Sequence, residues 1–201
     1  VSRAPRNTTM YVRPYSNLFF EYIFQNFTVM VWSSAQPHSV EFMCRMFGSY
    51  KSKIAAIWDR TSFGLNSHQF RNKVTTIKDL EKVWQHFGSE VFNATNTILL
   101  DDSPNKTVLQ PFNVIHPIEF EHHSTAFSSN GDSELIQILD YLKEIRYQSN
   151  VANYIKSHPY ESILNNKHNS FKTIQFIKAN GNESHLVDFS LNSLSNKINK
   201  F

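Results

Sequence analysis

The sequence has few of the residues on which several common protein classes depend. One cysteine, Cys44, occurs in 201 residues, so no disulfide can form within the chain. The five glycines are scattered, which excludes a glycine-rich phosphate loop. No apolar run approaches the ~20 residues that a bilayer-spanning helix needs. The first acidic residue is Glu21. These absences argue against a disulfide-rich secreted module, a membrane span and a P-loop nucleotide site.

Charge of either sign is also sparse. The formal net charge is +3, and the basic residues are spread along the chain without a long run. A basic patch that binds nucleic acid is usually concentrated, so we expect no nucleic-acid partner. What the chain does contain is apolar residues, at 40% of the total with 14% aromatic. That is enough for one sizeable core, which we place in residues 1–148. Residues 149–201 are richer in Asn, Ser and Lys, and we expect a partly helical extension there.

Apolar runs and amphipathic segments alternate along the first 148 residues. The pattern predicts strands at 27–32, 53–58 and 97–100 and a short return to the sheet within 108–115. Helical spacing occurs at 15–25, 38–48, 77–87 and 132–147. Strands that alternate with helices predict an α/β fold with a doubly wound, mainly parallel sheet and helices on both faces.

Polar residues of chemical interest stand at or near the ends of these predicted elements. Asp101 and Asp102 follow a β-branched and aliphatic strand, Ser33 follows another, and Lys78 stands at the start of a predicted helix. Ligands of open α/β sheets bind outside the carboxyl ends of the strands, where two carboxylates can hold a divalent cation. Each residue also has a structural interpretation: the aspartates and Ser33 as caps of the turns that follow, and Lys78 as a solvated lysine.

Residues 59–76 interrupt the alternation with a polar stretch that we expect to lie over the strand ends. Loops in that position often determine specificity. Within it, Arg60 is a candidate to bind a second phosphate or an acidic peptide, and the alternative is an ordinary surface arginine.

Four short motifs in this order resemble a known family. They are Arg13-Pro14, Val31-Trp32-Ser33-Ser34, Lys78-Asp79-Leu80 and Leu100-Asp101-Asp102-Ser103-Pro104. Together they are similar to the phosphatases that act on the C-terminal domain of RNA polymerase II, a branch of the haloacid dehalogenase-like superfamily. The resemblance implies a magnesium-dependent protein serine/threonine phosphatase.

The resemblance also assigns roles to individual residues. Ser33 would donate a hydrogen bond to a phosphoryl oxygen, and Lys78 would hold the phosphate and the nucleophile together. Asp102 would bind Mg²⁺, and Asp101 would support its loop. A phosphorylated peptide or protein is the implied substrate.

The chain departs from this family at the first motif. The family's Asp-x-Asp motif supplies the aspartyl nucleophile from a central strand and should precede Arg13-Pro14, where this chain has no acidic residue. Without that strand, we expect two unpaired edges between the strand that ends at Ser33 and the strand that ends at Asp101. We therefore hypothesise that Val1 is not the biological start and that the strand lies upstream, or that a partner supplies it.

The alternative function is a catalytically inactive scaffold or protein-binding module, as in a mitochondrial protein-import subunit of similar fold. Such a module would bind its protein partner through residues 59–76 and the C-terminal extension. We expect an intracellular location, in the nucleus or cytoplasm, with the mitochondrion as the alternative.

Overall fold

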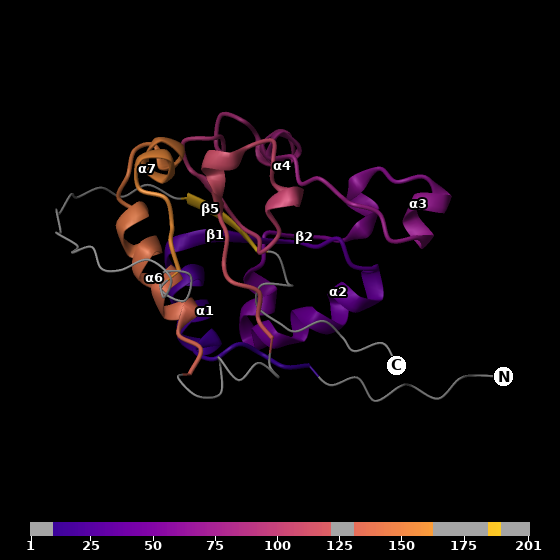
Figure 1. Cartoon of the computed structure of the whole chain (residues 1–201), viewed down its shortest axis with the longest axis horizontal. Coiled ribbons are helices and arrows are strands. Elements are labelled where there is room, and N and C mark those ends of the chain that lie inside the picture. The colour runs from indigo at the N-terminus through magenta and orange to yellow at the C-terminus, as the bar shows by residue number, and fades with distance from the viewer. Residues whose placement is uncertain (1–9, 122–130, 163–184, 190–201) are drawn as a thin grey trace.

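The computed structural model describes residues 10–121, 131–162 and 185–189, and these residues form one parallel sheet with its covering helices (Figure 1). The five strands are β1 (Phe27–Trp32), β2 (Ala56–Trp58), β3 (Thr97–Leu100), β4 (Val114–Ile115) and β5 (His185–Phe189). Their order across the sheet is β2-β1-β5-β3-β4, and every pairing is parallel.

Each face of the sheet has its own apolar core, because successive side chains of a strand point to opposite faces. From β1, Val29 and Val31 enter the larger core, whereas Met30 and Trp32 enter the smaller one. Nearly all side chains of β1 and β3 are buried, whichever face of the sheet they point to. This explains why both strands are continuous apolar runs in the sequence.

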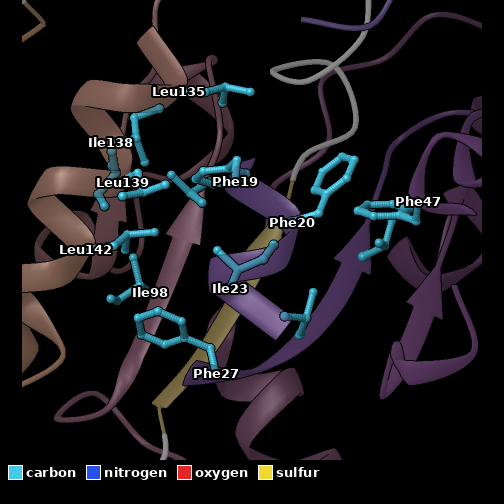
Figure 2. Packing of buried hydrophobic residues seen from close by; sticks show 14 of the residues in the cluster. Phe19, Phe20, Ile23, Phe27, Phe47, Ile98, Leu135, Ile138, Leu139 and Leu142 are labelled. Carbon is cyan, nitrogen blue, oxygen red and sulfur yellow. The ribbon is translucent and has the colours of Figure 1, made fainter. Parts of the chain in front are cut away.

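The larger core is covered by several helices. They are α1 (Ser16–Asn26), α2 (Pro37–Met43) with the following 3₁₀ segment η1 (Cys44–Lys53), α6 (Glu134–Ile145) and α7 (Val151–Ser157). Figure 2 shows the α6 side chains on one flank of α1 and Phe47 of η1 on the other, where its ring centroid lies 4.8 Å from that of Phe20. The smaller core is covered by α4 (Leu80–Phe87) through Leu80, Val83 and Trp84.

The α/β class and the parallel sheet are thus confirmed, and the doubly wound order remains a prediction. Two helix boundaries differ from the prediction by more than two residues. The helix expected at 38–48 changes to 3₁₀ geometry after Met43 and kinks at Gly48, whose φ is +54°. The helix expected from residue 77 begins at Leu80 instead, because Asp79 caps it by accepting a hydrogen bond from the Glu81 amide. Lys78 therefore precedes the helix and does not stand at its start.

The centre of the sheet differs from the prediction in a more important way. Strand β5 lies between β1 and β3, with Phe189 in register with Val31 on one side and Leu100 on the other. The expectation of two unpaired edges is therefore wrong for the described strands, and neither an upstream strand nor a partner is required to complete this sheet. The composition of residues 149–201 predicts only a partly helical extension in this part of the chain. Its short run His185–Phe189 is apolar enough to form a central strand.

The remaining short elements lie in the connections. They are η2 (Arg60–Phe63), α3 (Ser67–Arg71), η3 (Pro104–Lys106) and η4 (Pro111–Asn113). The first two belong to the polar stretch 59–76, which follows β2 at the carboxyl edge of the sheet.

Candidate functional site

A buried ion pair lies at the carboxyl edge of the sheet. The Nζ atom of Lys78 is 3.0 Å from Oδ2 of Asp101, and the two side chains are 1% and 0% exposed. The contact lacks the directionality of a hydrogen bond, and no other described group bonds to either atom. The ammonium therefore keeps N–H groups that can bind an anionic ligand.

The backbone holds both partners of this ion pair in place. The Lys78 amide donates to the Lys106 carbonyl over 2.7 Å, which fastens the segment before α4 to the loop after β3. The Asp101 amide donates to the Ile115 carbonyl of β4, and its Oδ1 accepts from the Ser103 amide over 2.8 Å. Asp101 thus caps its own turn, as the structural interpretation predicted, and also pairs with Lys78.

Lys78 links the two halves of the sheet's carboxyl edge. Besides Asp101 at the end of β3, its Nζ lies 5.9 Å from the centroid of the Trp32 ring at the end of β1. Because β5 separates these two strands, the ammonium lies across the middle of the edge. Trp32 provides a cation–π contact and excludes water from one side of the charge.

Ser33 directly follows Trp32 and is 1% exposed. Its amide donates to the Trp58 carbonyl, and its Oγ accepts a hydrogen bond from the Ala35 amide over 3.2 Å. The serine therefore acts as a cap of the strand end, and its hydroxyl hydrogen can still be donated to a ligand. The structure places it on the strand end next to the Lys78 contact.

Asp102 is half-buried beside the ion pair. Burial, and to a lesser extent the charge of Asp101, raise the pKa of this carboxyl above its ordinary value. Its Oδ1 accepts a hydrogen bond from the Ser103 hydroxyl over 3.0 Å. An anion that the protein disfavours in this way becomes more stable when a cation binds next to it.

The two aspartates fit a metal ion unequally. One carboxylate oxygen of Asp101 accepts a hydrogen bond from the Ser103 amide and the other pairs with the Lys78 ammonium, so neither oxygen is open to a metal ion. Asp102 offers the available carboxylate, an oxygen ligand of the kind that Mg²⁺ prefers. Within the described ranges, no group of three or more His, Cys, Asp or Glu side chains converges as a metal site. Asp102 therefore fits Mg²⁺ as a single protein ligand.

Arg60 does not join this group. It is 7% exposed, so it is not the surface arginine of the alternative interpretation. Its guanidinium donates hydrogen bonds of 2.7 to 3.1 Å to four backbone carbonyls, those of Ser34, Gln69, Phe70 and Asn72. With four of its five N–H groups used, Arg60 is poorly suited to bind a second phosphate, and it fastens the 66–72 loop to the end of β1.

A second buried polar cluster was missed in the sequence. Arg13 pairs with Asp132 at 2.6 Å, and Glu134, which is fully buried, accepts hydrogen bonds from the Ile118 amide and from Tyr160 and Ser162. These contacts join four distant segments of the chain. The sequence signal was weak, because Asp132 and Glu134 resemble ordinary acidic residues of a helix's first turn.

A parallel sheet with a buried lysine and a carboxylate pair at its carboxyl edge has the features of a phosphatase-like α/β domain. The chain belongs to the NLI interacting factor-like phosphatase family, whose model matches residues 2–152. The family assignment made from the four motifs is thereby confirmed.

Curated relatives agree with this assignment. The chain is 37% identical over 157 residues to an FCP1 homology domain-containing protein of Schizosaccharomyces pombe, covering 74% of this chain and 64% of that protein. It is 27% identical to the ubiquitin-like domain-containing CTD phosphatase 1 of Homo sapiens, over 67% of this chain and 42% of the relative. The corresponding Drosophila melanogaster protein is 25% identical, over 72% and 45%. The chain thus spans less than two thirds of each of these relatives.

The structure also bears on the membrane prediction. None of the helices in the described ranges has the length and apolar character that a membrane crossing requires.

Proposed function

We propose that this chain is a large part of a magnesium-dependent serine/threonine protein phosphatase whose aspartyl nucleophile comes from outside these 201 residues. The observation that carries the proposal is the buried ammonium of Lys78, which lies 3.0 Å from Asp101 with N–H groups still available. A phosphoryl group is the dianionic ligand that such an ammonium would bind most strongly. The relatives named CTD phosphatase also support a phosphatase activity for this chain.

The residues would divide the work as follows. Lys78 would neutralise negative charge on the phosphoryl oxygens, and Asp101 would keep the ammonium oriented. Ser33 would donate its hydroxyl hydrogen to one of these oxygens. Trp32, buried against Lys78, would keep water from weakening the electrostatic contact. Bound at Asp102, Mg²⁺ would supply further neutralisation of the phosphate charge.

A catalytically inactive, phosphoprotein-binding scaffold is the second candidate. The observation that favours it is β5, because this segment occupies the central place in the sheet, which the family's nucleophile-bearing strand would otherwise take. The chain contains no Asp-x-Asp sequence anywhere. In that case Ser33, Lys78 and Asp102 would bind a phosphorylated protein partner without hydrolysing it.

Phosphate binding and turnover can be tested separately. Tungstate, a tetrahedral oxyanion, should raise the melting temperature of the chain, and Lys78→Met should abolish that rise. No rise in the wild-type chain would refute both candidates. Hydrolysis of a phosphoserine peptide by the protein isolated from its natural source, dependent on Mg²⁺, supports the phosphatase. Oxyanion binding without hydrolysis by that natural protein would refute the phosphatase and support the scaffold.

A further inference from the structure

A pocket of about 560 Å³ lies beside the end of β1, separate from the ion pair. It is lined by Gln36, Leu65, Ser67, Phe70 and Arg71. All but Gln36 come from the polar stretch that follows β2, and Gln36 is the third residue after Ser33. The pocket is therefore built where the strand end meets the 65–71 segment.

Hydrogen bonds make this pocket a fixed part of the fold. The Phe70 carbonyl accepts from both the Gln36 amide side chain and Arg60 Nε, each over 3.0 Å. Arg60 also donates to the Ser34 carbonyl, so one buried guanidinium ties the pocket wall to the loop that follows Ser33. At the other end of the wall, a capping box between Asn66 and Gln69 fixes the start of α3.

The lining combines a cation with apolar surface. Leu65 and Phe70 are partly exposed, and Arg71 is exposed. The side chain of Arg71 makes no hydrogen bond or ion pair in the described part of the chain, so its guanidinium is available to a ligand. Between Asp59 and Asp79 the sequence contains no acidic residue, whereas Arg71 and Lys73 are exposed and basic. The local charge is therefore complementary to an anionic partner.

From this geometry we infer that the pocket recognises an acidic residue near the phosphorylated residue of a peptide. The inference depends on the proposed phosphate site. A glutamate fits the lining, because its aliphatic stem can pack on Leu65 and Phe70 while its carboxylate pairs with Arg71. Gln36 is three positions after Ser33 in the chain, a span of at most ~11 Å. The glutamate thus stands two or three positions from the phosphoserine or phosphothreonine.

The test uses fluorescein-labelled peptides and fluorescence anisotropy at 0.15 M salt, a condition in which nonspecific charge effects are screened. Phosphoserine peptides carry a single glutamate at −3, −2, +2 or +3, and matched peptides carry glutamine there. A further set has serine in place of phosphoserine. Binding is measured with the full chain, with Arg71→Glu, and with Lys156→Glu as the control. Lys156 is an exposed residue of α7, and its substitution changes the net charge equally.

We expect glutamate at one of the four positions to tighten binding roughly threefold to tenfold over glutamine. Arg71→Glu should remove or reverse this preference, and Lys156→Glu should keep it. The preference for phosphoserine over serine should survive in Arg71→Glu, because Lys78 is unchanged.

The outcomes separate the two ideas. An equal glutamate preference in the wild-type chain and Arg71→Glu overturns the pocket assignment, as does the absence of any glutamate preference. If the wild-type chain does not distinguish phosphoserine from serine but Arg71 still determines the glutamate preference, the phosphate site is refuted and the pocket stands. Failure of the wild-type chain to bind any of the peptides overturns both.

Discussion

Replacing Lys78 with methionine should be strongly destabilising, because the change leaves the fully buried carboxylate of Asp101 without its cation. Breaking one partner of a buried ion pair typically costs about 3–5 kcal/mol. In a domain of this size, that corresponds to a fall in melting temperature of roughly 6–20 °C. Methionine keeps the length and most of the volume of lysine, so little of the loss arises from a cavity.

Urea unfolding followed by tryptophan fluorescence measures this cost, and Trp32 beside Lys78 reports on the site directly. Two further variants test the electrostatic explanation. Adding Asp101→Asn to Lys78→Met removes the unpaired charge and should recover much of the stability. Lys143→Ala breaks an ion pair with Asp140 whose side chains are 51% and 61% exposed, and should cost at most about 1 kcal/mol. A Lys78→Met cost below about 1 kcal/mol, or a double variant no more stable than the single one, would refute the reasoning.

Three other changes test separate parts of the structure. Asp102→Asn should raise the melting temperature at pH 7, because the raised pKa of Asp102 means that ionisation of this carboxyl destabilises the fold. The gain in melting temperature should shrink as the pH falls through that pKa, and only the wild type should be stabilised by millimolar Mg²⁺. Arg60→Lys keeps the charge but loses the fork of hydrogen bonds to four carbonyls, so trypsin should cleave faster within residues 66–73; an unchanged cleavage rate would contradict that anchoring role. Deleting residues 163–201 removes β5 and exposes one edge each of β1 and β3, so we expect the protein to aggregate or to lose cooperative unfolding, as measured by circular dichroism. A truncated protein that remains a cooperatively folded monomer would argue against the central pairing.

The sequence predicted the fold well where apolar periodicity was strong. Strands β1 and β3 match their predicted bounds, since both are nearly continuous apolar runs buried on two faces. One helix start shifted because capping decided the boundary: Asp79 caps α4, which begins at Leu80 and not at the predicted residue 77. Strand β5 was missed as a sheet component because nothing local in a five-residue run reveals a long-range parallel pairing.

The candidate site was predicted unevenly for a similar reason. Asp101, Asp102 and Ser33 follow strands, and parallel strands bring their carboxyl ends to one edge. Lys78 required the motif resemblance, because no periodicity indicates that a lysine is buried. The role of Arg60 could not be predicted, since its four acceptors are backbone carbonyls, which any residue supplies. Arg71 was part of the expected loop but carried no signal of its own.

The central position of β5 also constrains the order in which the protein can fold. Its neighbours β1 and β3 are made long before it, because a ribosome synthesises the chain from the N-terminus. Until His185–Phe189 is synthesised and leaves the exit tunnel, β1 with β2 and β3 with β4 are two separate half-sheets, and the inner edge of each, on β1 and on β3, stays unpaired. The half-sheets can join only after the last of these strands arrives. During translation, the nascent chain therefore presents two apolar strand edges, those of β1 and β3. Chaperones that bind extended segments would compete with β5 for these edges.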